Sequence, residues 1–169
     1  MHRPIENCYW VIPGQLLAGE YPGAMDVAFA RAKIGALLEA GITAFIDLTR
    51  EEDGLLPYTH LLQGATHERF PIRDYSVPAS PADMVAILDA IDGHLRQGNM
   101  VYVHCWGGVG RTGVMIGCWL ARHGYQGMAA LDRLRELWQQ CPKSAHRVSP
   151  ETEEQEQYIV NWVENLTQV

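Results

Sequence analysis

The chain has 169 residues, of which 47% are hydrophobic and 20% are charged, and this composition excludes a disordered or fibrous protein. Its 13 Lys and Arg residues are outnumbered by 20 Asp and Glu residues, so the formal net charge is −7 and the protein should not coat nucleic acids or anionic membranes. The length suits one domain over residues 1–169, which we expect to bind any anion at a single local site.

The cysteines and the N-terminal residues indicate a cellular location. Four cysteines are widely spaced and form no CxxC pair, which is typical of a reducing compartment. The first residues lack the apolar core of a signal peptide, and no apolar run approaches the ~18 residues that span a bilayer. We therefore expect a cytoplasmic protein. The histidines show no HxH or HExxH spacing, so no metal is expected.

Two short strands, residues 10–12 and 16–18, are expected on either side of a Pro-Gly turn. A helix follows over residues 26–40, because apolar residues recur there with a period near 3.6 and Gly41 stands where a helix-ending glycine is common. The apolar positions of that helix are Phe29, Ile34, Leu37 and Leu38. Residues 42–46 and 66–72 are then predicted as two strands of one sheet, the second partly polar.

The next helix has a clear start. Ser80 is a suitable N-cap, Pro81 suits the first turn, and Asp83 matches a capping box. We expect this helix to end near Arg96 and to lead into a short apolar strand over residues 100–103. The order strand, helix, strand implies a parallel crossover, and the apolar strand should be central in the sheet.

Three helices complete the chain. Residues 107–110 form a glycine-rich turn before a helix over residues 112–123. The last two helices are expected over residues 128–140 and 150–166, the latter with Ser149 as its N-cap and a proline in its first turn. Together the elements predict an α/β fold with a central, mostly parallel sheet of about five strands and helices on both faces.

The segment from His104 to Gly113 reads HCWGGVGRTG and lies where a predicted strand ends and a helix begins. Open α/β sheets bind ligands at such positions. Its glycines allow a sharp turn whose N–H groups point inward, and the helix adds the positive end of its dipole. The predicted phosphate-binding residues are Trp106, Gly107, Gly108, Val109, Gly110 and Arg111.

Two side chains of this segment are suited to phosphate chemistry. Cys105 lies at the mouth of the loop, where the positive field favours its thiolate, and a thiolate is a nucleophile. Arg111 follows six residues later and can donate two N–H groups to a phosphoryl group in its transition state. We predict that Cys105 attacks a phosphate ester while Arg111 holds it.

The same segment resembles the signature of the cysteine-based protein tyrosine and dual-specificity phosphatases, His-Cys-x-x-Gly-x-Gly-Arg-Thr-Gly, at every fixed position. Residues 41–49, 70–74 and 149–155 also resemble the compact dual-specificity type. The resemblance implies the α/β fold, a phosphocysteine intermediate and hydrolysis without a cofactor.

The resemblance also implies roles for residues outside the loop. The family uses an upstream loop aspartate as general acid, and Asp74 matches it in position and context. Asp47 and Asp53 are rivals, but Asp47 ends a predicted buried strand and Asp53 lies in an acidic run typical of a solvated turn. Thr112 would place its hydroxyl near the cysteine sulfur. Gln155 resembles a glutamine that orients the hydrolytic water in some relatives, although a surface glutamine in a polar helix is an equal interpretation.

Several residues in and behind this segment allow other interpretations. Gly108, Gly110 and Gly113 also fit a GxGxxG dinucleotide pattern, but the helices that follow provide no second mononucleotide half. His104 is expected to support the loop by bonding to the backbone rather than to act as a base. The Trp106 indole either lines the pocket or packs against other side chains. For Cys118, packing is the default and a disulfide with Cys105 under oxidation is the alternative.

The expected substrates are proteins or peptides carrying phosphotyrosine, with phosphoserine and phosphothreonine as further candidates. The chain is short for a classical tyrosine phosphatase, which favours the dual-specificity type. A phosphoinositide or other small-molecule phosphatase is an alternative, disfavoured because the loop carries no lysine. A non-catalytic phosphoprotein-binding module is another, disfavoured by intact Cys105, Arg111 and Asp74. A monomer without nucleic-acid or membrane partners is expected, and an RNA phosphatase is disfavoured because no basic stripe is present.

Overall fold

The computed structural model describes residues 2–164. Five strands form one sheet in the order β1-β2-β5-β3-β4. The strands are β1 (Cys8–Ile12), β2 (Leu16–Gly19), β3 (Ile42–Asp47), β4 (Thr66–Arg69) and β5 (Met100–His104). Only β1 and β2 pair antiparallel, since β2 pairs parallel with β5, and β3 pairs parallel with both β5 and β4. The predicted mostly parallel sheet is therefore confirmed, and its apolar strand β5 is central.

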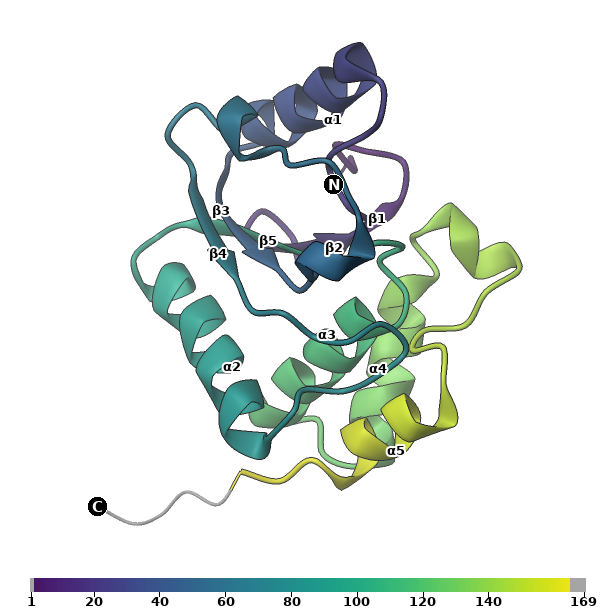
Figure 1. The fold of residues 1–169 in the computed structure, drawn as a ribbon. Coiled ribbons are helices and arrows are strands. Elements are labelled where there is room, and N and C mark those ends of the chain that lie inside the picture. The colour runs from purple at the N-terminus through teal and green to yellow at the C-terminus, as the bar shows by residue number, and fades with distance from the viewer. Residues whose placement is uncertain (1, 165–169) are drawn as a thin grey trace.

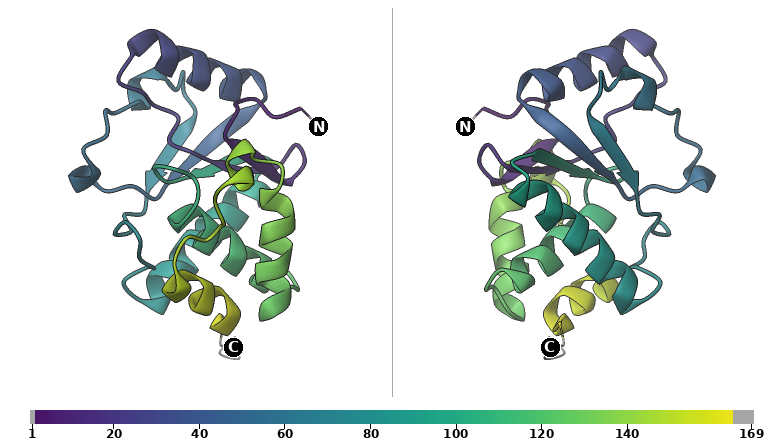
Figure 2. Two further views of the ribbon diagram at one scale, coloured as in Figure 1. Left: turned by 90° about the vertical axis from the view of Figure 1, so that its right-hand side faces the viewer. Right: turned by 90° about the vertical axis from the view of Figure 1, so that its left-hand side faces the viewer.

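Helices cover both faces of the sheet (Figure 1). Helix α1 (Val27–Glu39) lies on one face, and the opposite face carries α2 (Pro81–Arg96), α3 (Arg111–Arg122), α4 (Met128–Trp138) and α5 (Glu153–Asn161). The two side views in Figure 2 show the same three layers. Short 3-10 helices lie at η1 (Glu51–Asp53), η2 (Thr59–Leu61) and η3 (Pro142–Ala145). Within residues 2–164, no helix is long and apolar enough to cross a membrane.

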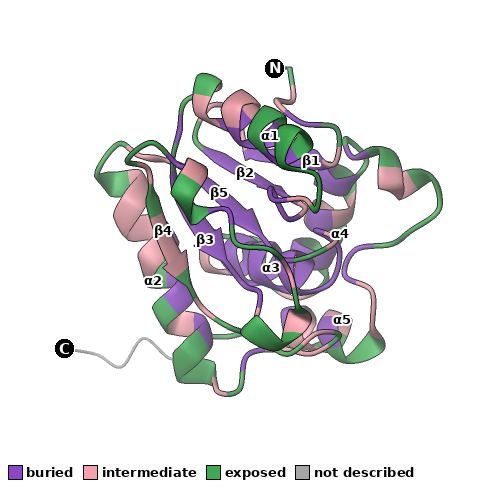
Figure 3. Ribbon diagram, turned by 45° about the horizontal axis from the view of Figure 1, so that its top comes forward, coloured by how far each residue is buried: buried purple, intermediate pink, exposed green. Residues whose placement is uncertain are grey.

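The core has one apolar cluster on each side of the sheet, because successive side chains of a strand point to opposite faces. Phe45 and Tyr102 join the cluster under α1, whereas Ile46 and Val103 join the larger cluster under α2 to α5. Figure 3 shows β3, β5 and α3 as the buried interior. Every residue of α3 from Arg111 to Ala121 is buried, so this helix is rigidly held behind the carboxyl end of β5.

The prediction for the last helix is wrong at its start. Thr152, not Ser149, is the N-cap of α5, and it forms a capping box with Gln155. The Ser149 hydroxyl instead donates a hydrogen bond to the Val109 carbonyl at 2.7 Å, so it is not free to cap a helix. The proline that follows Ser149 lies outside the helix, which begins at Glu153. The helix ends at Asn161, and the predicted end at residue 166 lies outside the described residues.

Two further predictions are corrected. Phe29 is 59% exposed, because the buried face of α1 instead includes Lys33, whose amine is bonded to Glu20 and to the Tyr21 carbonyl. Strand β4 ends at Arg69 rather than at residue 72. Pro71 has no N–H to continue the ladder, although the chain still follows β3 through single backbone bonds on either side of it.

Candidate active site

The loop between β5 and α3, residues 105–110, is shaped by close contacts with the end of β2 and with the residues before α5. Gly108 has φ of +75°, and a Cβ there would lie 2.5 Å from the Gly19 carbonyl carbon, so the close approach to β2 requires glycine. A Cβ on Gly110 would clash with the Glu151 carboxylate. The local sequence thus fixes both the turn of the loop and its contact with the residues before α5.

In the backbone of this loop, carbonyl groups form hydrogen bonds with other parts of the chain, whereas in the described part of the structure the N–H groups of residues 106–110 do not. Carbonyls of Trp106, Gly107 and Val109 accept hydrogen bonds of 2.8, 2.8 and 2.7 Å from Tyr21 N–H, the Lys143 amine and the Ser149 hydroxyl, respectively. Within the described residues, no N–H of residues 106–110 donates to another group. Because the carbonyls are held by outside donors and the N–H groups are free, the loop is suited to an anion.

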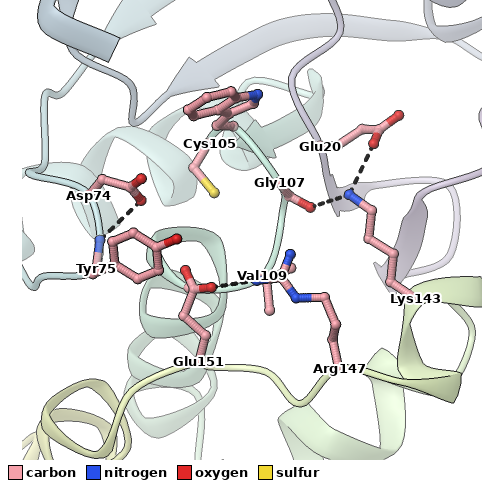
Figure 4. Close-up of a pocket in the computed structure, with 11 residues that line it drawn as sticks. Glu20, Asp74, Tyr75, Cys105, Gly107, Val109, Lys143, Arg147 and Glu151 are labelled. Atoms are coloured by element: carbon pink, nitrogen blue, oxygen red, sulfur yellow. Dashed lines mark hydrogen bonds and ion pairs between the residues drawn. The ribbon is translucent and has the colours of Figure 1, made fainter.

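Cys105 is the first residue of this loop. Its thiol is free, and the residue is 3% exposed. It lines a cavity of about 370 Å³ that Figure 4 shows in close-up. The other lining residues are Glu20, Asp74, Tyr75, Trp106, Gly107, Val109, Gly110, Lys143, Arg147 and Glu151. The structure therefore brings Asp74 and most of the predicted loop residues into one cavity with the candidate nucleophile.

Arg111 is buried behind the cavity rather than on its wall, with 1% of its side chain exposed. Its Nη1 donates to Asp53 Oδ2 at 2.6 Å and to the Ile72 carbonyl at 3.0 Å, and Nη2 lies 3.3 Å from Asp74 Oδ1. Burial alone would lower the pKa of Arg111, but Cys105, Asp53 and Asp74 outweigh it, so the pKa is raised and the charge is secure. Among described groups, Nε and Nη2 have no hydrogen-bond partner. These are the two donors that an anion could use.

The prediction of a solvated turn at Asp53 is wrong. The Asp53 side chain is 9% exposed, and it accepts hydrogen bonds from Arg111 and from the Arg50 N–H. Its neighbours Glu51 and Glu52 are exposed, as expected of an acidic run. Asp53 turns inward because the buried Arg111 guanidinium needs a counter-charge, which the local sequence does not reveal.

The three candidate acids occupy different environments. Asp74 is 36% exposed at the cavity, and one of its oxygens accepts the Tyr75 N–H at 3.0 Å. Asp47 is fully buried, as predicted, and bonded to His67 and Thr49. Burial would raise the pKa of Asp47, but these hydrogen bonds hold it well below its usual range. Asp47 and Asp53 do not line the cavity, so position favours Asp74 as the acid.

His104 and Thr112 are both buried. Burial lowers the pKa of His104 to about 4, so the ring is neutral at pH 7. His104 Nδ1 is 3.1 Å from the Cys105 carbonyl, and Nε2 is 2.5 Å from the Tyr58 hydroxyl. Nδ1–H must donate to the carbonyl, so Nε2 accepts from Tyr58. The Thr112 hydroxyl has no hydrogen-bond partner among the described residues, so the implied bond to the Cys105 sulfur is not formed here.

Gln155 is fully buried, so the surface interpretation is wrong. Its side-chain nitrogen donates to the Ser76 carbonyl at 3.0 Å, and its oxygen accepts the N–H groups of Glu151 and Thr152. The amide therefore joins the start of α5 to the loop that carries Asp74. It does not line the cavity in this structure.

Two ion pairs at the cavity are absent from the sequence prediction. Lys143 lies 3.1 Å from Glu20, and Arg147 lies 2.6 Å from Glu151. Burial raises the pKa of Glu151, and Asp74 raises it further against the opposing effect of Arg147. Glu151 could have been found from the sequence, because it lies within residues 149–155, which resemble the dual-specificity type. Arg147 precedes Glu151 by four residues, which is a local spacing, whereas Lys143 and Glu20 come from distant segments.

A central parallel strand that ends beside a cysteine, followed by this loop and a buried helix, defines the fold and site of the cysteine-based phosphatases. The family model of the Swiss Army Knife protein DSP-PTPase phosphatase domain, PTP-SAK, matches residues 5–159. The chain belongs to this family.

The chain is also similar to individual proteins. The chain is 34% identical over 93 residues to an uncharacterised Methanocaldococcus jannaschii protein, MJECL20, covering 55% of this chain and 56% of that protein. The chain thus spans about half the length of the curated relatives it matches. Tk-PTP in its active form has a TM-score of 0.71 at 23% identity and covers 90% of this chain and 93% of its own. Kinase associated phosphatase, with its catalytic-site cysteine replaced by serine, has a TM-score of 0.71 at 22% identity, covering 85% and 83%. These two likenesses concern the fold.

Proposed function

We propose that this domain hydrolyses phosphomonoesters on proteins through a phosphocysteine intermediate. The observation that carries the proposal is the loop around Cys105, whose carbonyls are bonded outward and whose N–H groups are free. Such a loop binds the phosphoryl oxygens and places phosphorus over the sulfur. Membership of the DSP-PTPase family and the buried, charged Arg111 support the same chemistry.

The reaction has two displacements at phosphorus. The Cys105 thiolate attacks, a sulfur–phosphorus bond forms, and the ester oxygen leaves with a proton from Asp74. Water then attacks phosphocysteine and gives a proton to the Asp74 carboxylate, which releases inorganic phosphate and restores the thiolate. Arg111 presents Nε and Nη2 to the phosphoryl oxygens, and Thr112 steadies the departing sulfur after a small movement of its hydroxyl.

The proposed substrate is phosphotyrosine in proteins, with phosphoserine and phosphothreonine as further substrates. Three carboxylates and two cations line the cavity, and both cations are already paired. A cavity with this charge favours a substrate with one phosphate over a polyphosphorylated lipid headgroup. A monomeric state and a cytoplasmic location are part of the proposal, to be checked by light scattering and cell fractionation.

Replacement of the nucleophile tests the proposal. Cys105→Ser should abolish hydrolysis of p-nitrophenyl phosphate, whereas vanadate should still bind because the N–H groups and Arg111 remain. Wild-type enzyme mixed rapidly with this substrate should release a burst of p-nitrophenol if phosphocysteine accumulates. A variant that keeps more than about a thousandth of the wild-type rate would rule out the covalent mechanism. A wild-type protein that binds phosphopeptides without hydrolysis would instead be a binding module.

A further inference from the structure

A second cavity of about 340 Å³ lies beside the active-site cavity. Trp106 and Glu20 line both cavities, so the two cavities adjoin at these side chains. Most of the walls of the second cavity come from two segments, residues 20–25 after β2 and residues 53–56 at the end of η1, and Lys33 of α1 and Trp106 complete them. A ligand with its phosphate over Cys105 could therefore extend across Trp106 into this cavity.

The two walls are joined by specific bonds. The Tyr21 hydroxyl donates to the Leu56 carbonyl at 2.7 Å, which ties the first segment to the second. The Tyr21 N–H donates to the Trp106 carbonyl at 2.8 Å, which ties the first segment to the phosphate loop. Lys33 of α1 donates to the Tyr21 carbonyl at 2.7 Å. These hydrogen bonds hold the cavity walls together. The bond to Trp106 also fixes the position of the cavity relative to Cys105, because both residues belong to the phosphate loop.

The open surface of the second cavity is apolar. Met25 is 84% exposed, Trp106 52% and Leu56 47%, although such side chains are usually covered. Its charged residues are already engaged, since Lys33 pairs with Glu20 and Asp53 pairs with Arg111. The cavity therefore offers apolar contact area and no unpaired charge of its own.

We propose that this second cavity binds an apolar side chain next to the phosphorylated residue of a protein substrate. The inference rests on the proposed function. Consecutive Cα atoms of a peptide are 3.8 Å apart, so a side chain one or two positions from the phosphorylated residue can pass over a single indole. A peptide is favoured over a lipid because Glu51, Glu52 and the net charge of −7 would repel an anionic membrane from this face. Burial of the apolar side chain would add affinity that the phosphate loop alone does not supply.

Paired phosphopeptides test this inference. Four positions would be varied one at a time, namely the two residues before and the two residues after phosphotyrosine. At each position one peptide would carry Leu and its partner Ser, with all other residues unchanged. For wild-type protein, Leu at one of these positions should raise kcat/KM about tenfold over Ser. Met25→Ser and Leu56→Ser should bring this ratio close to unity, while kcat/KM for p-nitrophenyl phosphate, which is too small to reach the second cavity, stays at the wild-type value.

Met128→Ser is the matched control, because Met128 is 53% exposed at the start of α4 on the opposite face of the sheet. It should keep the wild-type ratio. A wild-type protein that hydrolyses p-nitrophenyl phosphate but shows no preference at any position would overturn the inference and leave the proposed function intact. Failure to hydrolyse p-nitrophenyl phosphate at all would overturn the proposed function. If Met25→Ser instead lowered activity only on vesicles containing long-chain phosphoinositides, the cavity would be an acyl-chain site and the peptide inference would be wrong.

Discussion

Two aspartates contact the Arg111 guanidinium, and their positions give them different tasks. Asp53 is nearly buried and bonds to Nη1, on the side away from the cavity. Asp74 lies at the cavity and is close to Nη2. Since only Asp74 can reach a leaving group over Cys105, Asp53 is better suited to orienting Arg111 than to donating a proton.

Asparagine variants should separate these tasks. Asp74→Asn removes the proton donor, so kcat/KM should fall steeply for phosphoserine, whose leaving group needs a proton, and less for p-nitrophenyl phosphate. In a plot of kcat/KM against pH, the fall on the alkaline side (the alkaline limb) should disappear in Asp74→Asn. Asp53→Asn should instead lower kcat/KM by a similar factor for both substrates and keep that limb. Persistence of the alkaline limb in Asp74→Asn, with its loss in Asp53→Asn or Asp47→Asn, would show that the acid is misassigned.

Glu151 places a carboxylate against the phosphate loop, where it should oppose anion binding. Glu151→Gln keeps the shape, removes the charge and frees Arg147 from its ion pair. We expect inhibition by inorganic phosphate to strengthen about fivefold at pH 8, which corresponds to about 1 kcal/mol for a like charge near 4 Å in water. The gain should shrink as the pH falls, because the raised pKa of Glu151 lets the wild-type carboxyl take up a proton. An unchanged inhibition constant at pH 8 would mean that Arg147 already neutralises this carboxylate.

At the scale of elements, the strand, loop and helix around Cys105 are predictable because they are contiguous in the sequence. Their apolar runs and glycines fix each conformation locally. The start of α5 is not predictable in this way. Ser149 and Thr152 are both competent N-caps, and the choice depends on the Val109 carbonyl, which is 40 residues away. The burial of Asp53 and Gln155 has the same origin, since their partners lie on other elements.

Helix α3 also depends on a close contact that the sequence does not show. A Cβ on Gly117 would lie 2.6 Å from Ile159 Cγ1 of α5 and within 2.9 Å of its Cγ2. Gly93 of α2 is also within a helix, but a Cβ there would meet nothing within 4 Å. The two glycines therefore differ in packing while sharing a helical conformation.

Alanine at these two positions should have opposite effects. Gly117→Ala should lower the free energy of unfolding by about 1 to 3 kcal/mol, because the added methyl group overpacks the contact between α3 and α5. Gly93→Ala should raise it by about 0.4 to 1 kcal/mol, because alanine restricts the unfolded chain. Urea unfolding of both variants measures the difference. Equal effects would show that helix propensity, and not packing, decides the outcome at Gly117.

For the molecule as a whole, the buried ionisable groups behind the loop make stability depend on pH. His104 has a pKa of about 4 in the folded protein, because burial outweighs the attraction of Asp47, and an ordinary value of 6.5 in the unfolded chain. Between these values the unfolded state binds a proton that the folded state does not, so the free energy of unfolding falls as the pH is lowered. Asp47 extends the fall below its ordinary value of 3.8, because its folded pKa is lower still and the unfolded chain is protonated first.

Urea titrations at several pH values from 7.5 to about 4 measure this dependence. From about pH 6 to about pH 4.5, His104 should contribute a slope approaching 1.4 kcal/mol per pH unit, which corresponds to one proton. His104→Gln should remove that part of the slope even if it lowers stability at pH 7, whereas His60→Gln at an exposed position should retain it. A wild-type protein equally stable at pH 7 and pH 4.5 would mean that His104 is protonated in the folded state. Its Nε2 would then donate to the Tyr58 hydroxyl rather than accept from it, whereas Nδ1 would still donate to the Cys105 carbonyl.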